Sequence, residues 1–248
     1  TLGAGLSSSA ALETATALAL QSLFDFEMSR VDVATLCQRV EHRYANVMCG
    51  IMDQFASGLG RSNHALLLDC RTLSHVNIPT NLEKYRIVII SSEVKRELTS
   101  SAYNERRGQC EEGVALLRQF DPSIASLRDV TPDLFDAYGD QLSKIVFQRC
   151  RHVITENARV LDASAALAAD ELAQFGRLMT ASHKSLRDDF EVSCDELDCL
   201  VDIAYGTEGV LGSRMTGAGF GGCTVTLIHM DAIETLRANL LPYTDRFG

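Results

Sequence analysis

The stretch Gly3-Ala4-Gly5-Leu6-Ser7-Ser8-Ser9-Ala10-Ala11-Leu12 decides the interpretation of this chain. Its two glycines allow a tight turn that comes close to a ligand, and three hydroxyl side chains follow. Residues 10–24, rich in Ala and Leu, predict a helix. A glycine-rich turn before a helix N-terminus favours anion binding, because unpaired N–H groups and the helix dipole point at the ligand. We expect a phosphate site here; a flexible tail before an ordinary helix is the alternative.

Two better-known phosphate motifs do not match this stretch. The P-loop pattern G-x-x-x-x-G-K-[ST] requires a lysine, and no Lys lies near Gly5. The dinucleotide pattern G-x-G-x-x-G requires a third glycine where Ser8 stands. The turn is therefore neither a P-loop nor a dinucleotide-binding loop, and both interpretations given above stay open.

Composition and net charge limit the classes of partner that this chain can bind. The chain has 248 residues and a net charge of −10, without a block of Lys or Arg, which argues against nucleic acid or a membrane surface as partner. An acidic protein can still bind a nucleotide through backbone N–H groups and a metal ion. Eight cysteines form no C-x-x-C pair, and we find no signal peptide or membrane-spanning run. We expect a cytoplasmic protein with free thiols.

The pattern of apolar residues predicts a mixed α+β protein. Apolar runs of strand length occur at 65–68 and 86–90, and the polar segment 72–81 between them contains Pro79. We expect the domain boundary within residues 62–85. Further helices are expected at 93–119, 142–168, 171–185 and 194–205, and Thr131-Pro132 has the pattern of a helix start. Helices in long runs with strands in clusters are typical of α+β layers.

One carboxylate falls on the apolar face of an expected helix. The residues that define this face after Ser29 are Val33, Leu36, Cys37, Val40, Tyr44 and Val47. Glu41 follows Cys37 by four residues and therefore shares the face. A buried carboxylate is costly unless a charged group meets it. A metal ion and a core ion pair both satisfy this requirement.

Two further segments carry candidate chemistry. Residues 217–222 contain four glycines before the strand-like run 224–228, which fits either close approach to a ligand or a bulged hairpin. Asp53 follows Cys49-Gly50-Ile51-Met52 at the start of a short expected helix. Its carboxylate is ionised at neutral pH and able to accept a proton. The alternative for Asp53 is a simple helix cap.

Several of these segments resemble galactokinases of the GHMP kinase superfamily. The opening turn resembles the pattern P-x-G-x-G-L-S-S-S-A, with Thr1 at the usual Pro. The similar segments, in chain order, are Cys49-Gly50-Ile51-Met52-Asp53-Gln54, Ser101-Ala102-Tyr103-Asn104-Glu105-Arg106-Arg107, Arg151-His152-Val153-Ile154-Thr155-Glu156-Asn157, 182–190 and Met215-Thr216-Gly217-Ala218-Gly219-Phe220-Gly221-Gly222-Cys223. The resemblance implies a two-domain α+β GHMP kinase fold with an incomplete N-terminal domain, 1–62, and a C-terminal domain, 63–248.

The resemblance also implies a reaction, the ATP-dependent phosphorylation of galactose at its C1 hydroxyl. Asp53 would be the catalytic base, and Ser9 and Glu41 would hold Mg²⁺. Gly50 and Tyr103 would line the sugar together with Asp53. The residues expected to contact the ATP phosphates are Gly3, Ala4, Gly5, Leu6, Ser7, Ser8, Ser9, Gly217, Gly219 and Gly221. We expect galactose and ATP as ligands and a monomeric protein.

The chain departs from the family at its ends. The segment G-R-x-N-L-I-G-E-H-x-D, which would supply an Arg at the phosphoryl group and sugar ligands, is absent from the 248 residues, as is the last segment beyond Gly248. We therefore expect a fragment with little or no activity alone. A kinase for a related sugar such as N-acetylgalactosamine and a non-catalytic sensor of sugar and ATP are the alternative functions.

Overall fold

The computed structural model describes residues 6–46, 48–94 and 99–247. The chain divides into two compact units, Thr1–Glu83 and Lys84–Gly248. The domain limits expected from the sequence, 1–62 and 63–248, remain a prediction. Within the described ranges, no helix combines the length and apolar character needed to cross a membrane.

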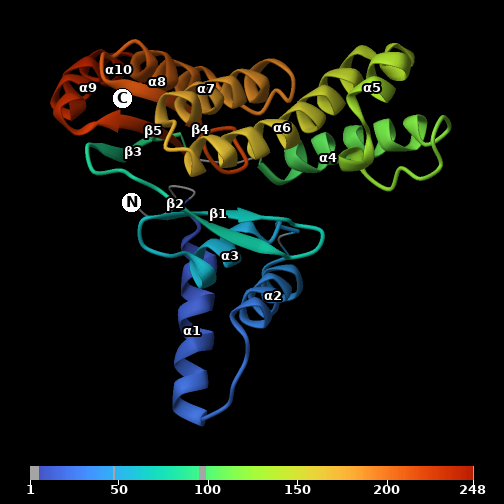
Figure 1. The fold of residues 1–248 in the computed structure, drawn as a ribbon, viewed down its shortest axis with the longest axis horizontal. Helices are drawn as coiled ribbons and strands as arrows, with labels where there is room; N and C mark the ends of the chain where they lie inside the picture. Colours follow the sequence, from blue (N-terminus) through green and yellow to red (C-terminus); the bar gives the residue numbers. More distant parts are fainter. Residues whose placement is uncertain (1–5, 47, 95–98, 248) are drawn as a thin grey trace. The chain divides into compact units, whose positions relative to one another are not determined.

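The first unit packs three helices and a hairpin around a small core. Its elements are α1 (Ser8–Phe24), α2 (Arg30–Val40), a π-helical turn (Glu41–Ala45), α3 (Met52–Leu59), β1 (His64–Leu68) and β2 (His75–Pro79) (Figure 1). The two strands pair antiparallel, His64 opposite Pro79. Ala34, Ile51 and Phe55 are buried at the centre. The three helices contact one another, and α3 contacts β1, so the loop before α3 is held close to α1 and α2.

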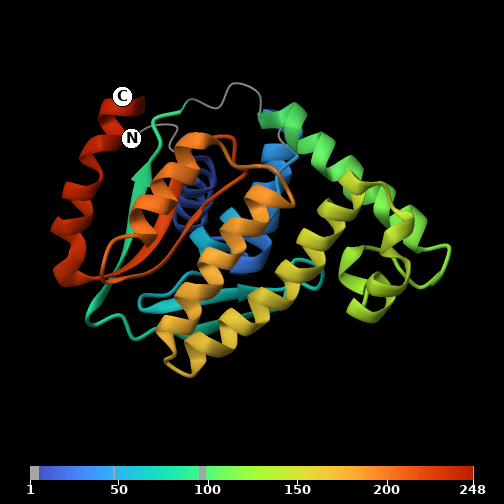
Figure 2. The ribbon, with the colours of Figure 1, turned by 90° about the horizontal axis from the view of Figure 1, so that it is seen from above.

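The second unit is a three-stranded antiparallel sheet covered by helices. Its elements are β3 (Tyr85–Ser91), α4 (Thr99–Leu117), α5 (Pro132–Tyr138), α6 (Lys144–Ala168), α7 (Leu172–Asp188), α8 (Asp195–Tyr205), β4 (Val210–Met215), β5 (Cys223–His229), α9 (Ile233–Asn239) and α10 (Leu241–Phe247), with short 3-10 turns at Leu127–Asp129, Gly139–Gln141 and Met230–Ala232. The strand order is β3-β5-β4. Helices α7 and α8 pack on β4, α6 packs on α7, and α4 on α6 (Figure 2).

A separate apolar core joins α4, α5 and α6. Its buried residues include Leu117, Leu127, Phe135, Val146 and Cys150. Thr131 caps α5, its hydroxyl accepting from Leu134 N at 3.2 Å, and Pro132 is the first helical residue, as the sequence predicts. This core gives α6 a rigid support independent of the sheet.

Two glycines allow α7 to lie directly on β4. A Cβ at Gly176 would come within 2.2 Å of Leu211 O, and one at Gly212 within 1.9 Å of Gly176 O. Such distances are excluded for real side chains, so the backbones of helix and strand are in direct contact. The position of α7 relative to β4 is therefore fixed by backbone geometry.

Three sequence predictions differ from the structure. The polar segment 72–81 contains β2, whose last residue is Pro79, where an edge strand tolerates the missing N–H. The helix expected at 93–119 is α4, described over Thr99–Leu117; residues 93 and 94 are not helical, Glu93 having a left-handed φ of 57°, and 95–98 lie outside the described residues. Tyr44, expected on the buried face of α2, is 81% exposed. The π-helical turn at Glu41–Ala45 explains this, because its extra residue rotates the following side chains away from the core.

Candidate functional site

Ser9 and Glu41 meet at the N-terminal end of α1. The Ser9 hydroxyl donates to Glu41 Oε1, although the two residues lie on different elements. Ser7, with a left-handed φ of 57°, precedes the first residue of α1. The first N–H groups of a helix have no acceptor within it. Gly3, Ala4 and Gly5 lie outside the described residues; of the expected phosphate ligands in this turn, Leu6 to Ser9 are described.

Glu41 is a buried carboxylate near a second carboxylate. Its side chain belongs to a residue only 7% exposed. Within the described residues, no Lys or Arg forms an ion pair with it. Burial and the neighbouring charge of Glu41 raise the pKa of Glu13, and Glu13 Oε2 is buried without a hydrogen-bond partner there. Two carboxylates in this position repel each other unless a cation or a proton lies near them.

The donor set is suited to a hard cation. A hydroxyl and carboxylate oxygens are the ligands that Mg²⁺ prefers, and Mg²⁺ usually keeps waters and substrate phosphates as its remaining ligands. No group of three or more His, Cys, Asp or Glu arranged for metal binding occurs among the described residues. The site therefore fits a cation that arrives with phosphate better than a metal held entirely by protein.

Asp53 lies in the first turn of α3, half-buried. The preceding loop is fixed by its Cys49 carbonyl, which contacts Gln38 Nε2 at 3.2 Å and His42 Nε2 at 2.9 Å. Burial and the charges of Glu41 and Asp53 raise the pKa of the Cys49 thiol. The charges of both carboxylates, Glu41 and Asp53, act on the Cys49 thiol. Asp53 therefore lies in the same part of the unit as Glu41. Gly50 is exposed, with open space where a side chain would stand.

The other predicted site residues belong to the second unit. Tyr103 lies on α4, and Gly217, Gly219 and Gly221 lie in the turn between β4 and β5. Thr216 N donates to Cys223 O at 2.9 Å and closes this turn. We call residues 216–222 the glycine-rich turn.

Packing inside the second unit accounts for part of the glycine content of this turn. Gly219 has φ +87°, and a Cβ there would lie 2.0 Å from Val192 O. Met215 N, just before the turn, donates to His183 Nδ1 at 3.3 Å, and His183 Nε2 lies 3.2 Å from Asp198 Oδ1. Gly219 is thus required by geometry whether or not a ligand binds.

Two family profiles match the chain in the order of its two units. The GHMP kinase N-terminal domain matches residues 1–61, and the GHMP kinase C-terminal domain matches residues 163–242. The chain belongs to the GHMP kinase family. Its α+β fold class is confirmed by this assignment.

Among GHMP kinases, the most similar relatives include galactokinases. The chain is 46% identical to galactokinase of Roseiflexus sp. over 247 residues, which are 99% of this chain and 63% of that protein. It is 49% identical to the human galactokinase over 231 residues, 93% of this chain and 58% of that protein. The chain thus spans less than two thirds of the length of these relatives.

Comparison with solved structures shows the same similarity to GHMP kinases. The crystal structure of Lactococcus lactis galactokinase complexed with galactose matches with a TM-score of 0.93 at 40% identity, over 99% of this chain and 63% of that one. The mevalonate kinase of Methanococcus jannaschii matches with a TM-score of 0.62 at 20% identity, over 97% of this chain and 62% of that one, which shows the shared fold alone.

Glu13 is a site candidate that the sequence analysis did not select. It stands four residues after Ser9, so the two side chains share one face of α1. This four-residue spacing from Ser9 was the one feature of the sequence that could have indicated Glu13 as a site residue. It could not by itself distinguish a site residue from a solvent-exposed glutamate, because the interaction of Glu13 with Glu41 joins two segments far apart in the sequence.

A cavity of about 430 Å³ elsewhere in this GHMP kinase chain contains none of the predicted site residues. It lies between α5, α6 and α7. Its lining is apolar except for five polar side chains, Asp136, Arg151, Thr155, Arg159 and Asp162. Both cations are already engaged, Arg151 with Asp189 and Arg159 with Glu156. The cavity is therefore not a candidate for the phosphate site.

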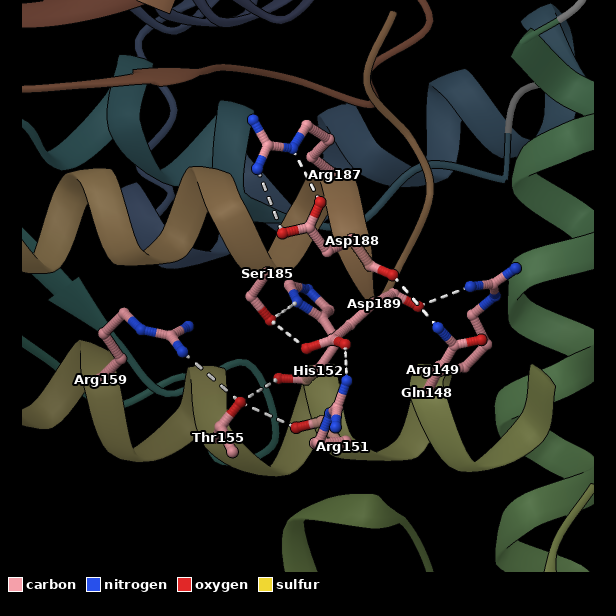
Figure 3. A network of polar contacts seen from close by, with 10 residues as sticks. All are labelled: Gln148, Arg149, Arg151, His152, Thr155, Arg159, Ser185, Arg187, Asp188 and Asp189. Atoms are coloured by element: carbon pink, nitrogen blue, oxygen red, sulfur yellow. Dashed lines mark hydrogen bonds and ion pairs between the residues drawn. The ribbon is translucent and has the colours of Figure 1, made fainter. Parts of the chain in front are cut away.

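Polar side chains of α6 and α7 form a dense network beside that cavity (Figure 3). His152 Nδ1 contacts Ser185 Oγ at 2.9 Å, and Ser185 Oγ donates to Asp189 Oδ2 at 3.1 Å. Burial, opposed in part by Asp189 and reinforced by the cations of Arg159, Arg214 and Arg149, lowers the pKa of His152 from 6.5 to about 4. His152 is therefore neutral in the folded protein at neutral pH and donates through Nδ1.

This low pKa predicts a loss of stability in mild acid. Below about pH 6.5 the unfolded chain binds a proton at this histidine, whereas the folded chain does so only near pH 4. Stability therefore falls as pH drops through this window, by about 2 kcal/mol at pH 5. Urea unfolding of the chain between pH 7 and 5 should show this slope, and His152→Gln should flatten it. The exposed His64→Gln is the control; an equal slope in His152→Gln would contradict the assignment.

Proposed function

We propose that the full-length protein containing this chain is a galactokinase, which transfers the γ-phosphoryl group of ATP to the C1 hydroxyl of galactose. The products are galactose 1-phosphate and ADP. The observation that carries the proposal is the meeting of Ser9 with the buried Glu41 at the start of α1, in a chain similar to galactokinases over almost its whole length. Among the described residues, no Lys or Arg forms an ion pair with Glu41.

In this proposal Ser9 and Glu41 hold Mg²⁺, which supplies positive charge to the phosphate oxygens. Backbone N–H groups of residues 3–9 bind the ATP phosphates at the N-terminal end of α1. The glycine-rich turn, through Gly217, Gly219 and Gly221, closes the phosphate side. Because phosphoryl transfer depends mainly on positioning and charge stabilisation, these groups carry most of the catalysis.

Asp53 acts on the sugar. Its carboxylate accepts the proton of the C1 hydroxyl as that oxygen forms its bond to the γ-phosphorus and the bond to ADP breaks. The loop before α3, anchored through the Cys49 carbonyl to Gln38 and His42, holds the carboxylate in place. Gly50 has open space where a side chain would stand, which we take as room for the sugar; Tyr103 is a second proposed sugar contact.

A coupled ADP-release assay tests the proposed function. The full-length protein with Mg²⁺, ATP and galactose should release ADP, and ³¹P NMR should identify galactose 1-phosphate. N-acetylgalactosamine should be a poorer acceptor, and the 248-residue chain alone should show little or no turnover. ATP binding without turnover, a phosphate on another hydroxyl, or faster turnover of N-acetylgalactosamine would contradict the proposal.

A further inference from the structure

Residues 188–192, the last residue of α7 and the segment that follows it, are held by an unusual series of side-chain contacts. Four consecutive carbonyl oxygens accept from α4 and α6. Gln148 Nε2 donates to Asp188 O at 3.3 Å, Arg149 Nη1 to Asp189 O at 2.5 Å, Arg106 Nε to Phe190 O at 2.8 Å and Arg106 Nη2 to Glu191 O at 3.1 Å. Figure 3 shows the contact from Arg149. Three of these four carbonyls belong to residues beyond the end of α7, and two arginines supply three of the four donors.

The fifth carbonyl of the series bonds to the glycine-rich turn. Phe220 N donates to Val192 O at 2.7 Å. The backbone approach at Gly219 is so close that a Cβ would lie 2.0 Å from the same oxygen. Val192 and Met215 share a buried apolar cluster, against which Phe190 and Phe220 pack. A shift of residues 188–192 would therefore shift Gly219 and Phe220 with it.

Of the two arginines that hold residues 188–192, Arg149 is the buried one. Only 2% of it is exposed, and besides Asp189 O its guanidinium donates to Gln109 Oε1 at 2.9 Å and Glu191 Oε2 at 2.5 Å. Each of the three acceptors is reached by a different nitrogen of the guanidinium, an arrangement that suits the fork of an arginine and that a lysine cannot reproduce. Glu191, one of these partners, has a left-handed φ of 51°, which the surrounding contacts must maintain.

We propose that Arg149 is a positioning residue for the nucleotide site. With Arg106, it fixes residues 188–192, and through Val192 O it sets the position of the backbone N–H groups of the glycine-rich turn toward the ATP phosphates. This inference rests on the proposed function, since it takes the turn to be a phosphate ligand. It assigns no contact between Arg149 and substrate.

A second arginine of the same unit, exposed where Arg149 is buried, makes a similar set of backbone contacts and provides a control. Arg118, just beyond α4, donates to Ile124 O at 2.6 Å and to Ala125 O at 3.4 Å. It also clamps two successive carbonyls after a helix, but it stands about 18 Å along the helix axis from Arg106. Loss of Arg118 should cost stability without affecting nucleotide binding. A merely structural role for Arg149 predicts the same result for both arginines.

The test uses the full-length protein and calorimetric titration with the Mg²⁺ complex of a non-hydrolysable ATP analogue. Arg149→Met should weaken nucleotide binding by about tenfold or more, the usual effect of misplacing a donor to a charged group. Arg149→Lys should be intermediate, and Arg118→Met should equal wild type. The Kd for galactose, titrated separately, should stay unchanged in all three. Should Arg149→Met fail to fold, Arg106→Met, which keeps the buried cation, is titrated in its place.

The outcomes separate the two proposals. Wild-type affinity for the analogue in a folded Arg149→Met, or in its substitute, overturns the positioning role alone. Parallel losses of galactose and nucleotide affinity also overturn it, because they indicate general disruption. A wild-type protein that binds no Mg²⁺–nucleotide contradicts the proposed function itself.

Discussion

The Asp53→Asn variant of the full-length protein should lose catalysis while keeping its ligands. We expect kcat to fall by about 10²–10⁴-fold, the contribution of a well-placed general base. The amide has the shape of the carboxylate but cannot accept the proton from the C1 hydroxyl. Steady-state kinetics with galactose and ATP, together with titration of the Mg²⁺–nucleotide complex, measure the two properties separately.

Glu27→Gln is the matched control for this variant. Glu27 is an exposed carboxylate of the same unit, and its amide variant should turn over at the wild-type rate. If Asp53→Asn retains full kcat, Asp53 is not the base. If it also loses nucleotide affinity, the side chain acts in binding or in folding instead of proton transfer.

The second large effect is expected at Glu41. Glu41→Gln keeps the volume of the side chain and an acceptor for the Ser9 hydroxyl but removes the charge proposed to hold Mg²⁺. We expect a loss of about a hundredfold or more in kcat/KM for ATP, comparable to removal of other groups that stabilise developing charge. Raising the Mg²⁺ concentration should recover part of this loss.

The same variant should be at least as stable as wild type without Mg²⁺. The wild-type carboxylate is buried beside Glu13 and has no Lys or Arg partner within the described residues, so its removal relieves an unfavourable charge. Thermal unfolding in EDTA measures this. A Tm well below that of wild type would indicate a structural ion pair, which was the alternative from the sequence. Glu13→Gln should show a similar gain in Tm with a smaller loss of activity.

Periodic segments of this chain could be predicted from the sequence. Helices α6 and α8 lie within two residues of the expected limits, because their apolar faces recur at helical spacing over several turns. The start of α5 was signalled by its Thr-Pro pair. The short polar strand β2 could not be recognised, since its pairing with β1 is what makes it a strand. The family assignment confirms the resemblance that rested on the motifs.

The site was only partly predictable. The burial of Glu41 followed from its position on the apolar face of the helix expected after Ser29, and the structure confirms the burial, although Glu41 lies in the π-helical turn after α2. The exposure of Tyr44, three residues later, depends on a π-helical turn. The spacing of apolar residues in the sequence does not indicate this turn. The close approach of Gly219 to Val192 is a tertiary contact, so the sequence allowed only a ligand or a hairpin as its reason. The roles of Ser9, Glu41, Gly50, Asp53 and Tyr103 stay predictions.

A crystal structure of the full-length protein with galactose, Mg²⁺ and a non-hydrolysable ATP analogue tests the central claim most directly. The account predicts an Asp53 carboxylate oxygen within about 3.2 Å of the C1 oxygen of galactose, with Mg²⁺ bound between the phosphates, Ser9 and Glu41. A sugar whose C1 oxygen lies away from Asp53, or a cation that contacts neither Ser9 nor Glu41, would contradict it.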